Sequence, residues 1–282
     1  MNRHRLARLA ARCIGQFNKN RCLIAASALS YTTIVSLVPL ATIMLAIFSG
    51  FPFFAVARER FLRVLLDNFA PDVGEQAAAW FQTVATTAGQ TTAIGAGALV
   101  VTSVLMLLTI EDHMQEIWEI PESRPWRQRV LAYWVVLTLG PMLIGVGFSL
   151  PGYLGGIAEH LGAGPVLANL GGPPWWGGLN IAITFFLQTI ALTMLYGLIP
   201  NCEVHFLDSV SGALAASILL EVLKILFTVF VARFSSYGTV YGALAGIPIF
   251  LLWMYIFWAV VLLGAELAAG LRHIRMTEEA HV

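Results

Sequence analysis

The sequence predicts an all-α membrane protein, a polytopic bundle with six transmembrane helices. Its 282 residues are 58% hydrophobic and only 11% charged, whereas an ordinary soluble domain is about 25% charged. Mean hydropathy is +0.78, and such a chain has too few polar side chains to cover a globule in water. Six apolar windows reach the roughly 20 residues that a helix needs to cross a bilayer. They cover 23–50, 92–111, 130–156, 176–199, 208–232 and 243–271, and 1–282 is expected to form a single membrane domain.

The segment before the first window, 1–21, is basic and has no acidic residue. Apolar residues recur here in the i, i+3, i+4, i+7 pattern of one helix face. They are Leu6, Leu9, Ala10, Cys13, Ile14 and Phe17. This predicts a basic amphipathic helix lying on the anionic cytoplasmic leaflet. The alternative is a helix that packs on the cytoplasmic loops.

The segment between the first two windows, 51–91, is too long for a bare connection. Leu62, Leu65, Leu66 and Phe69 recur at helical spacing before Pro71. We therefore expect a helical outer loop here.

Lysine and arginine in the flanks set the expected orientation, because cytoplasmic loops carry an excess of them. The outer loop 157–175 has none, and 200–207 has none either and so gives no support. Both termini are therefore expected in the cytoplasm. The basic residues that predict this are Arg3, Arg5, Arg8, Arg12, Lys19, Arg21, Arg124, Arg127, Arg129, Arg272 and Arg275.

A polar stripe runs along the fifth window, where Ser217, Glu221, Lys224 and Thr228 are spaced by four, three and four residues. At 1.5 Å per residue Glu221 lies about 20 Å from the cytoplasmic end. A charge near mid-bilayer costs about 2.5–3.5 kcal/mol on insertion scales, so we expect the stripe to face the interior. It is either a functional seam or a buried pair that specifies helix packing.

Glu266, in the sixth window, lies roughly 9 Å from the cytoplasmic end by the same rise per residue. Side chains of the first window at that depth are Ser27, Ser30 and Tyr31. The expected role of Glu266 is to accept hydrogen bonds from these hydroxyls, which would join two helices.

Gly238, Gly242 and Gly246 repeat every four residues before Pro248. Small residues at this spacing allow two membrane helices to approach closely. Helix packing is the favoured interpretation, and a hinge is the alternative.

No metal site, cofactor or disulfide is expected. The three cysteines, Cys13, Cys22 and Cys202, are scattered without metal-ligand spacing. His113 and Glu116 in 109–120 have a ligand-compatible spacing, but a second cluster is missing, which favours a solvated, charged helix end. No motif of a P-loop, zinc protease or serine hydrolase occurs. The net charge of zero suggests no nucleic-acid partner.

Four segments together carry a family resemblance. They are "ALSYTTIVSLVPL" (28–40), "IEDHMQEIWEIPESRPWRQR" (110–129), "YGLIPNCEVHFLDSVSGALAA" (196–216) and "RFSSYGTVYGALAGIPIFLLWMYIFWAVVLLGAELAA" (233–269). They resemble the YihY/BrkB family of bacterial inner-membrane proteins, with the last segment the most specific. The resemblance implies a six-span envelope protein, with proposed roles in envelope integrity and lipid or lipopolysaccharide traffic.

An older label, tRNA-processing ribonuclease BN, is attached to many members of that family. A ribonuclease needs a cytoplasmic catalytic site and a basic RNA surface, whereas the cytoplasmic loops here are short and partly acidic. We expect the label to be a misassignment and the protein not to be an enzyme.

Two functional hypotheses follow, besides the ribonuclease. The first is transport or translocation of a lipid or other envelope substrate through the interior polar seam. The second is a non-catalytic structural or assembly protein, in which the same charges only specify packing. The expected partners are membrane lipids and the anionic inner leaflet, and the sequence leaves homo-oligomerisation open.

Overall fold

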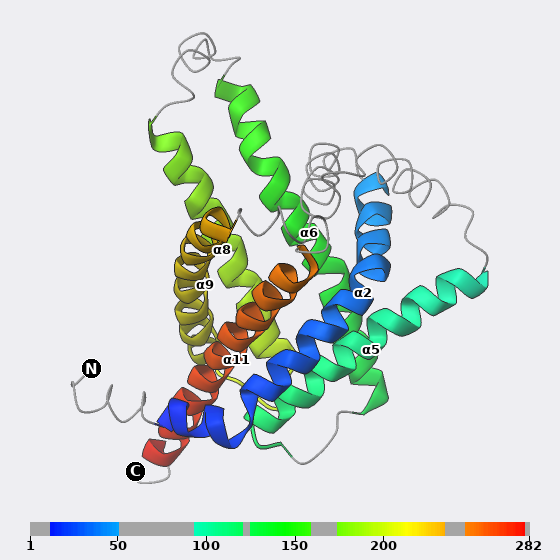
Figure 1. Cartoon of the computed structure of the whole chain (residues 1–282). Coiled ribbons are helices and arrows are strands. Elements are labelled where there is room, and N and C mark those ends of the chain that lie inside the picture. The colour runs from blue at the N-terminus through cyan, green and yellow to red at the C-terminus, as the bar shows by residue number, and fades with distance from the viewer. Residues whose placement is uncertain (1–11, 51–92, 121–124, 159–173, 235–245, 280–282) are drawn as a thin grey trace.

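A computed structural model describes residues 12–50, 93–120, 125–158, 174–234 and 246–279 (Figure 1). Most of the described residues are helical, and no strand occurs among them. Residues 12–19 form a short helix. The long helices are α2 (Cys22–Gly50), α5 (Ala93–Ile117), α6 (Trp126–Ala158), α8 (Pro174–Leu198), α9 (Phe206–Phe234) and α11 (Gly246–Glu279).

Each predicted window overlaps one of these helices, but helix and window differ in their ends. α5 continues past residue 111 to Ile117, and α11 continues past residue 271 to Glu279. The reason is that a helix ends where its backbone hydrogen bonds end, whereas an apolar window ends at the first charged residues. The expected outer helices in 51–91 lie outside the described residues.

Three helices of the described residues are long and apolar enough to cross a membrane, judged by length and composition. Their apolar segments are Ile181–Leu198 in α8, Phe206–Phe230 in α9 and Pro248–Thr277 in α11. Cys22–Ser36 in α2 is a shorter apolar helix. The structure thus shows an all-helical protein with three candidate spans, and six spans for the whole chain stay a prediction.

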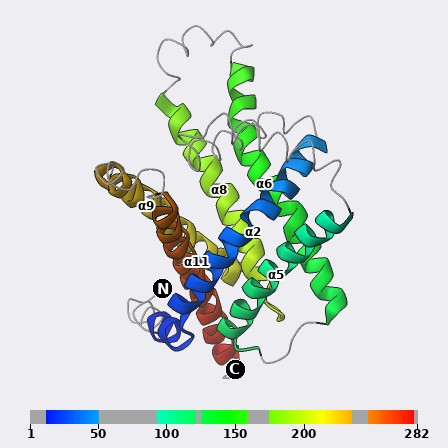
Figure 2. The same cartoon turned by 45° about the vertical axis from the view of Figure 1, so that its right-hand side comes forward.

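The helices pack side by side in the order α5, α2, α11, α9, α8 and α6. α11 packs against both α9 and α2, and α2 packs in turn against α5. α8 packs against α9 and α6. Figure 2 shows α2 beside α5, with α11 on the other side of α2. The buried core gathers at the end of the bundle where α2 and α9 begin and α5 and α8 end, with Leu29, Met114, Tyr196 and Leu220 among its most buried side chains.

α9 and α11 cross at very close range. A Cβ atom added to Gly212 of α9 would lie 2.5 Å from the carbonyl oxygen of Gly264 in α11. A Cβ atom added to Gly264 would lie 2.6 Å from the Cβ atom of Ala216. These small residues therefore let the two backbones touch. The glycine ridge predicted from the sequence is a different one: Gly246 is the first residue of α11, and Gly238 and Gly242 lie outside the described residues.

The short helix over 12–19 packs onto the protein at the end that also holds the C-terminal end of α11 (Figure 1). Cys13 is buried and Phe17 packs against the core, while Ile14 is exposed. Gln16 Nε2 donates a hydrogen bond to Glu119 Oε1, just beyond α5, at 3.2 Å. These contacts agree with the alternative of a helix that packs on neighbouring segments. Contact with the leaflet stays a prediction.

A buried carboxylate joins α5 to α6. Glu111 Oε1 accepts from Arg129 Nε and Nη2 at 3.1 and 3.0 Å and from Gln115 Nε2 at 2.7 Å. The hydroxyl of Tyr133 donates to Glu111 Oε2. The end of α5 was expected to be solvated, and this holds for the exposed Asp112 and Glu116 but not for Glu111. Glu111 differs because Arg129, near the start of α6, lies beside it.

A second ion pair joins α9 to α11 at the same end of the bundle. Arg275 Nη2 donates to Asp208 Oδ1 at 2.7 Å. Asp208 lies in the first turn of α9, where the helix dipole also favours a negative charge. Both of these ion pairs between helices therefore lie near helix ends.

Candidate functional site: a polar seam between α8 and α9

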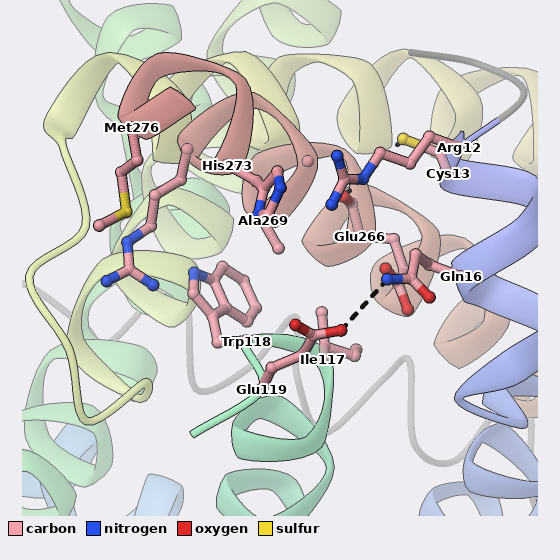
Figure 3. A pocket seen from close by; sticks show the side chains of 12 residues that line it. Arg12, Cys13, Gln16, Ile117, Trp118, Glu119, Glu266, Ala269, His273 and Met276 are labelled. Carbon is pink, nitrogen blue, oxygen red and sulfur yellow. Dashed lines mark hydrogen bonds between the residues drawn. The ribbon is translucent and has the colours of Figure 1, made fainter. Parts of the chain in front are cut away.

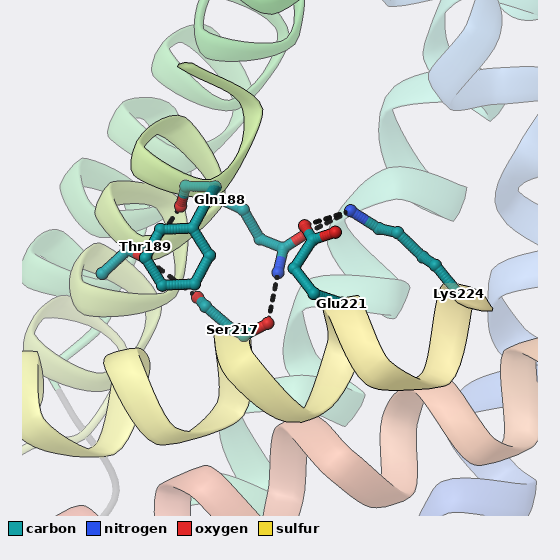
Figure 4. A network of polar contacts seen from close by, with 6 residues as sticks. Gln188, Thr189, Ser217, Glu221 and Lys224 are labelled. Carbon is teal, nitrogen blue, oxygen red and sulfur yellow. Dashed lines mark hydrogen bonds and ion pairs between the residues drawn. The ribbon is translucent and has the colours of Figure 1, made fainter. Parts of the chain in front are cut away.

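The seam is a row of polar side chains at the contact of α8 and α9 (Figure 4). Lys224 Nζ donates to Glu221 Oε1 at 2.7 Å and to Gln188 Oε1 at 3.1 Å. Gln188 Nε2 donates to the backbone oxygen of Ser217 at 3.4 Å. The hydroxyl oxygens of Thr189 and Ser217 lie 3.0 Å apart. We call these five residues the α8–α9 seam.

One end of the seam is closed, with its side chains buried, and the other end is open, with its side chains partly exposed. Ser217 is fully buried and Thr189 nearly so. Farther along α9, the side chains of Glu221 and Lys224 are 28% and 38% exposed. Their outward neighbours Ile225 and Leu226 are large, apolar and exposed, as expected for a helix face that meets lipid. The charged pair therefore lies at the edge of the helix contact, where another molecule can reach it.

The sequence stripe and the seam overlap in three residues. Ser217, Glu221 and Lys224 belong to both. Thr228 is exposed, and its Oγ1 donates to the carbonyl of Lys224 at 2.8 Å, so it takes no part in the contact with α8.

Gln188 and Thr189 belong to the seam and were not predicted from the sequence. A signal for them exists, because Gln188 is the one amide side chain between Ile181 and Leu198. An amide inside an apolar helix needs hydrogen-bond partners. The partner helix and the depth of the contact come only from the packing of α8 against α9.

The seam can exchange partners with a charged ligand. An ammonium group carries three donors, and two of those on Lys224 have acceptors among the described residues. Gln188 supplies an acceptor to Lys224 and a donor to Ser217. An anionic group that approaches from the open end can therefore take the third donor of Lys224 or replace Glu221.

Glu266 lies in another place, close to the chain reversal before α2. It is buried, and its Oε1 accepts from Asn20 Nδ2 at 2.7 Å and from Cys22 Sγ at 3.5 Å. The Cys13 thiol donates to the backbone oxygen of Glu266 at 3.8 Å. Burial, and then the charge of Glu266, raise the pKa of the Cys13 thiol, which keeps it protonated at neutral pH.

The hydroxyls that the sequence analysis assigned to Glu266 have other partners in the structure. Ser27 Oγ donates to the carbonyl of Leu23 at 3.1 Å, and Ser30 Oγ donates to that of Ala26 at 2.6 Å. Tyr31 is exposed. The turn at residues 20–21, with Arg21 at φ 48°, directs Asn20 onto Glu266 instead. Depth along the helices alone could not reveal this turn.

No group of three metal-binding side chains occurs within the part of the chain that the structure describes. His113 Nδ1 lies 3.8 Å from Glu116 Oε2, and this is an ordinary contact between neighbours one turn apart.

A bundle of long apolar helices, with large apolar side chains on its outside and a charged pair inside one helix, defines an integral membrane protein. Sequence comparison places the chain more closely. Residues 13–281 match the family model of virulence factor BrkB, and the chain belongs to this family. The resemblance found from the sequence is thereby confirmed.

Relatives in several bacteria are named UPF0761 membrane protein. The relative in Chromohalobacter salexigens is 38% identical over 94% of this chain and 63% of its own length. The relative in Aeromonas salmonicida is 33% identical over 91% of this chain and 86% of its own length. The chain spans only 56% and 55% of the relatives in Halorhodospira halophila and Rhodospirillum centenum. No solved structure matches the chain, and the names of these relatives state a membrane protein without a catalytic activity.

Proposed function

We propose that the chain is a non-enzymatic protein of the bacterial inner membrane that moves a lipid, or another charged envelope substrate, along the α8–α9 seam. In this proposal the chain crosses the membrane six times and has both termini in the cytoplasm. The proposal accounts for a charged pair inside an apolar helix, where charge is expensive.

One observation carries the proposal: Glu221 and Lys224 are paired but remain 28% and 38% exposed within the candidate span Phe206–Phe230. At 1.5 Å per residue Glu221 lies about 22 Å from the start of that span and about 14 Å from its end. A pair that served packing alone would be sheltered between helices. This pair borders the apolar outer face instead, where a lipid head group can meet it.

The head group of a lipid is the part that resists movement through the membrane, because its charge must leave water. At the seam, Lys224 would pair with the anionic group of a passing lipid. Before the lipid arrives and after it leaves, Glu221 and Gln188 would accept the hydrogen bonds of Lys224. The acyl chains would stay in the bilayer against the apolar face of α9. This division of roles favours an amphiphile over a small soluble ion.

The test is transbilayer movement of a labelled anionic phospholipid in proteoliposomes that contain the purified chain. Lys224→Met removes the charge and keeps most of the side-chain length, so we expect the movement to fall by about tenfold or more, a change of at least about 1.4 kcal/mol in the barrier. Thr228→Val is the matched control, since Thr228 lies one turn farther along α9 and bonds to its own backbone. Movement as fast in Lys224→Met as in the wild type would refute the seam pathway.

A structural or assembly function is the second candidate, and one observation favours it. The contacts of Lys224 with Gln188 and of Ser217 with Thr189 join α8 to α9, which is what a packing role requires. In that case Lys224→Met would lower the thermal stability or change the oligomeric size in detergent. Lipid movement would be equal in the variant and the wild type.

A further inference from the structure

A pocket of about 70 Å³ lies at the end of the bundle that holds the short helix over 12–19, the end of α5 and the last turns of α11 (Figure 3). One water molecule needs roughly 10–15 Å³ by this measure, so the pocket has room for a group of several heavy atoms. It is separate from the α8–α9 seam, whose residues do not line it.

The two carboxylates on the walls of the pocket already have partners. Glu119 accepts from Gln16 and lies 3.7 Å from Lys19 Nζ. Glu266 accepts from Asn20 and Cys22. The acceptors of the pocket are thus engaged with the protein itself.

Several donors on the same walls have no partner among the described residues. The guanidinium groups of Arg12 and Arg272 line the pocket without a hydrogen bond or an ion pair to any described residue. The Nε1–H group of Trp118 is buried and also lacks an acceptor. Figure 3 shows Arg12, Trp118 and His273 on the walls of this one pocket. A buried donor without an acceptor is rare in folded proteins, and here three donor groups that have no acceptor in the described part of the chain surround one space.

This donor set suits a phosphate group. Guanidinium groups bind phosphate oxygens through pairs of charge-assisted hydrogen bonds, and an indole N–H can donate to a further oxygen. The pocket also has an apolar side, formed by Ile117 and Ala269 and by the exposed Met276. The apolar segment of α11 reaches Thr277, next to this side. A ligand with a phosphate group and an attached hydrocarbon part matches both sides.

We propose that Arg12, Arg272 and Trp118 bind the phosphate group of an anionic phospholipid at the cytoplasmic surface of the membrane. The bound lipid would be resident, and it would hold the short helix over 12–19 against α11. This proposal goes beyond the function proposed above and does not rest on it. The pocket residues lie outside the seam, and the test measures lipid binding instead of lipid movement.

The test is a titration of the delipidated chain in neutral detergent, read by native mass spectrometry. The probes are phosphatidylglycerol, diacylglycerol with the same acyl chains, and inorganic phosphate. We expect the affinity for phosphatidylglycerol to fall by about tenfold or more in the Arg12→Gln/Arg272→Gln variant, because this variant cannot make the charge-assisted hydrogen bonds. Trp118→Phe removes only the N–H donor and should weaken binding by a smaller factor while leaving the fold intact.

A control variant separates the pocket from general surface charge. Arg127→Gln removes an exposed charge near the start of α6 and should bind the lipid as the wild type does. A loss in Arg127→Gln equal to that in Arg12→Gln/Arg272→Gln would mean that general surface charge carries the affinity. A loss in Lys224→Met with no loss in Arg12→Gln/Arg272→Gln would place the lipid at the seam. Either result overturns the proposal.

Comparison of the three probes shows whether the pocket binds a phospholipid or a soluble phosphate compound. Diacylglycerol should bind far more weakly than phosphatidylglycerol, and equal binding would overturn a phosphate site. Inorganic phosphate should bind weakly and compete only at high concentration. If it bound as tightly as the lipid, the pocket would belong to a soluble phosphate compound, and the lipid as its ligand would be refuted.

Discussion

At the scale of single residues, a buried charge in this protein is stabilised by hydrogen bonds from neighbouring side chains. Glu111 is 1% exposed and accepts hydrogen bonds from Arg129, Gln115 and Tyr133. Glu116, five residues later on the same helix, is 56% exposed and lies 3.8 Å from His113. The two glutamates look alike in the sequence, but only the first has a structural partner on another helix.

We predict that Glu111→Ala destabilises the protein strongly. The variant would leave Arg129 without its carboxylate at the contact of α5 and α6, and breaking a buried pair in this way costs about 3–5 kcal/mol. We allow for the partial exposure of Arg129 and expect the lower end of that range. Thermal unfolding in detergent should show a clear fall in Tm.

Glu116→Ala is the matched control for that variant, because it removes the same side chain from an exposed position. Its cost should stay within about 0.5 kcal/mol, as for most surface changes. Equal Tm values for the two variants would mean that the Glu111 pair contributes nothing to stability.

At the scale of helices, α9 and α11 make a very close contact through two glycines. Gly212 and Gly264 bring α9 and α11 together, and Tyr196 of α8 donates a hydrogen bond to the carbonyl of Val261 at 2.7 Å. In a membrane such contacts must come from packing and hydrogen bonds, because the lipid is as apolar as the helices. The seam helix α9 is thus held on one side by α11 and on the other by α8.

We predict that Gly212→Ala loosens the contact of α9 with α11. The new Cβ atom would lie 2.5 Å from a backbone oxygen, which cannot move away as a flexible side chain can. Overpacking of this kind costs about 1–3 kcal/mol. The measurement is the Tm of the purified chain in detergent.

Gly15→Ala is the control, since nothing lies within 4 Å of the Cβ atom added there in the short helix over 12–19. Alanine in a helix interior is more favourable than glycine by about 0.5–1 kcal/mol. The two substitutions should therefore shift Tm in opposite directions. A rise for both would argue against the close crossing.

At the scale of the whole molecule, one end of the bundle differs from the rest. The ion pairs Glu111–Arg129 and Asp208–Arg275 and the pocket lined by Arg12 and Arg272 all lie at this end. Farther along the helices, exposed side chains such as Leu105, Trp134 and Phe186 are apolar. Basic flanks face the cytoplasm, and this end carries Arg129, Arg272 and Arg275 in the structure.

We predict that this end faces the cytoplasm. The variant Arg127→Cys, made in a chain whose three cysteines are replaced by alanine, should resist a membrane-impermeant maleimide in intact spheroplasts and react after permeabilisation. The exposed position near the start of α6 makes the thiol accessible in itself. Equal labelling before and after permeabilisation would reverse the orientation.

How far the sequence predicts the structure depends on whether a feature lies within one helix. The apolar windows place the six long helices, and the spacing of Glu221 and Lys224 by three residues brings their charges together on α9. Both follow from the period and rise of a single helix. The membrane class follows in the same way from composition, because the chain cannot cover its apolar surface with polar side chains.

Only the tertiary structure decided which helices meet and at what depth. Gln188 reaches Lys224, Asn20 reaches Glu266 and Arg129 reaches Glu111 through rotations and turns that the order of residues does not reveal. The physical reason is that an apolar side chain suits a neighbouring helix and a lipid equally well. A helix that is apolar on every side therefore carries no mark of the face it will bury, and packing alone selects the partners of its few polar residues.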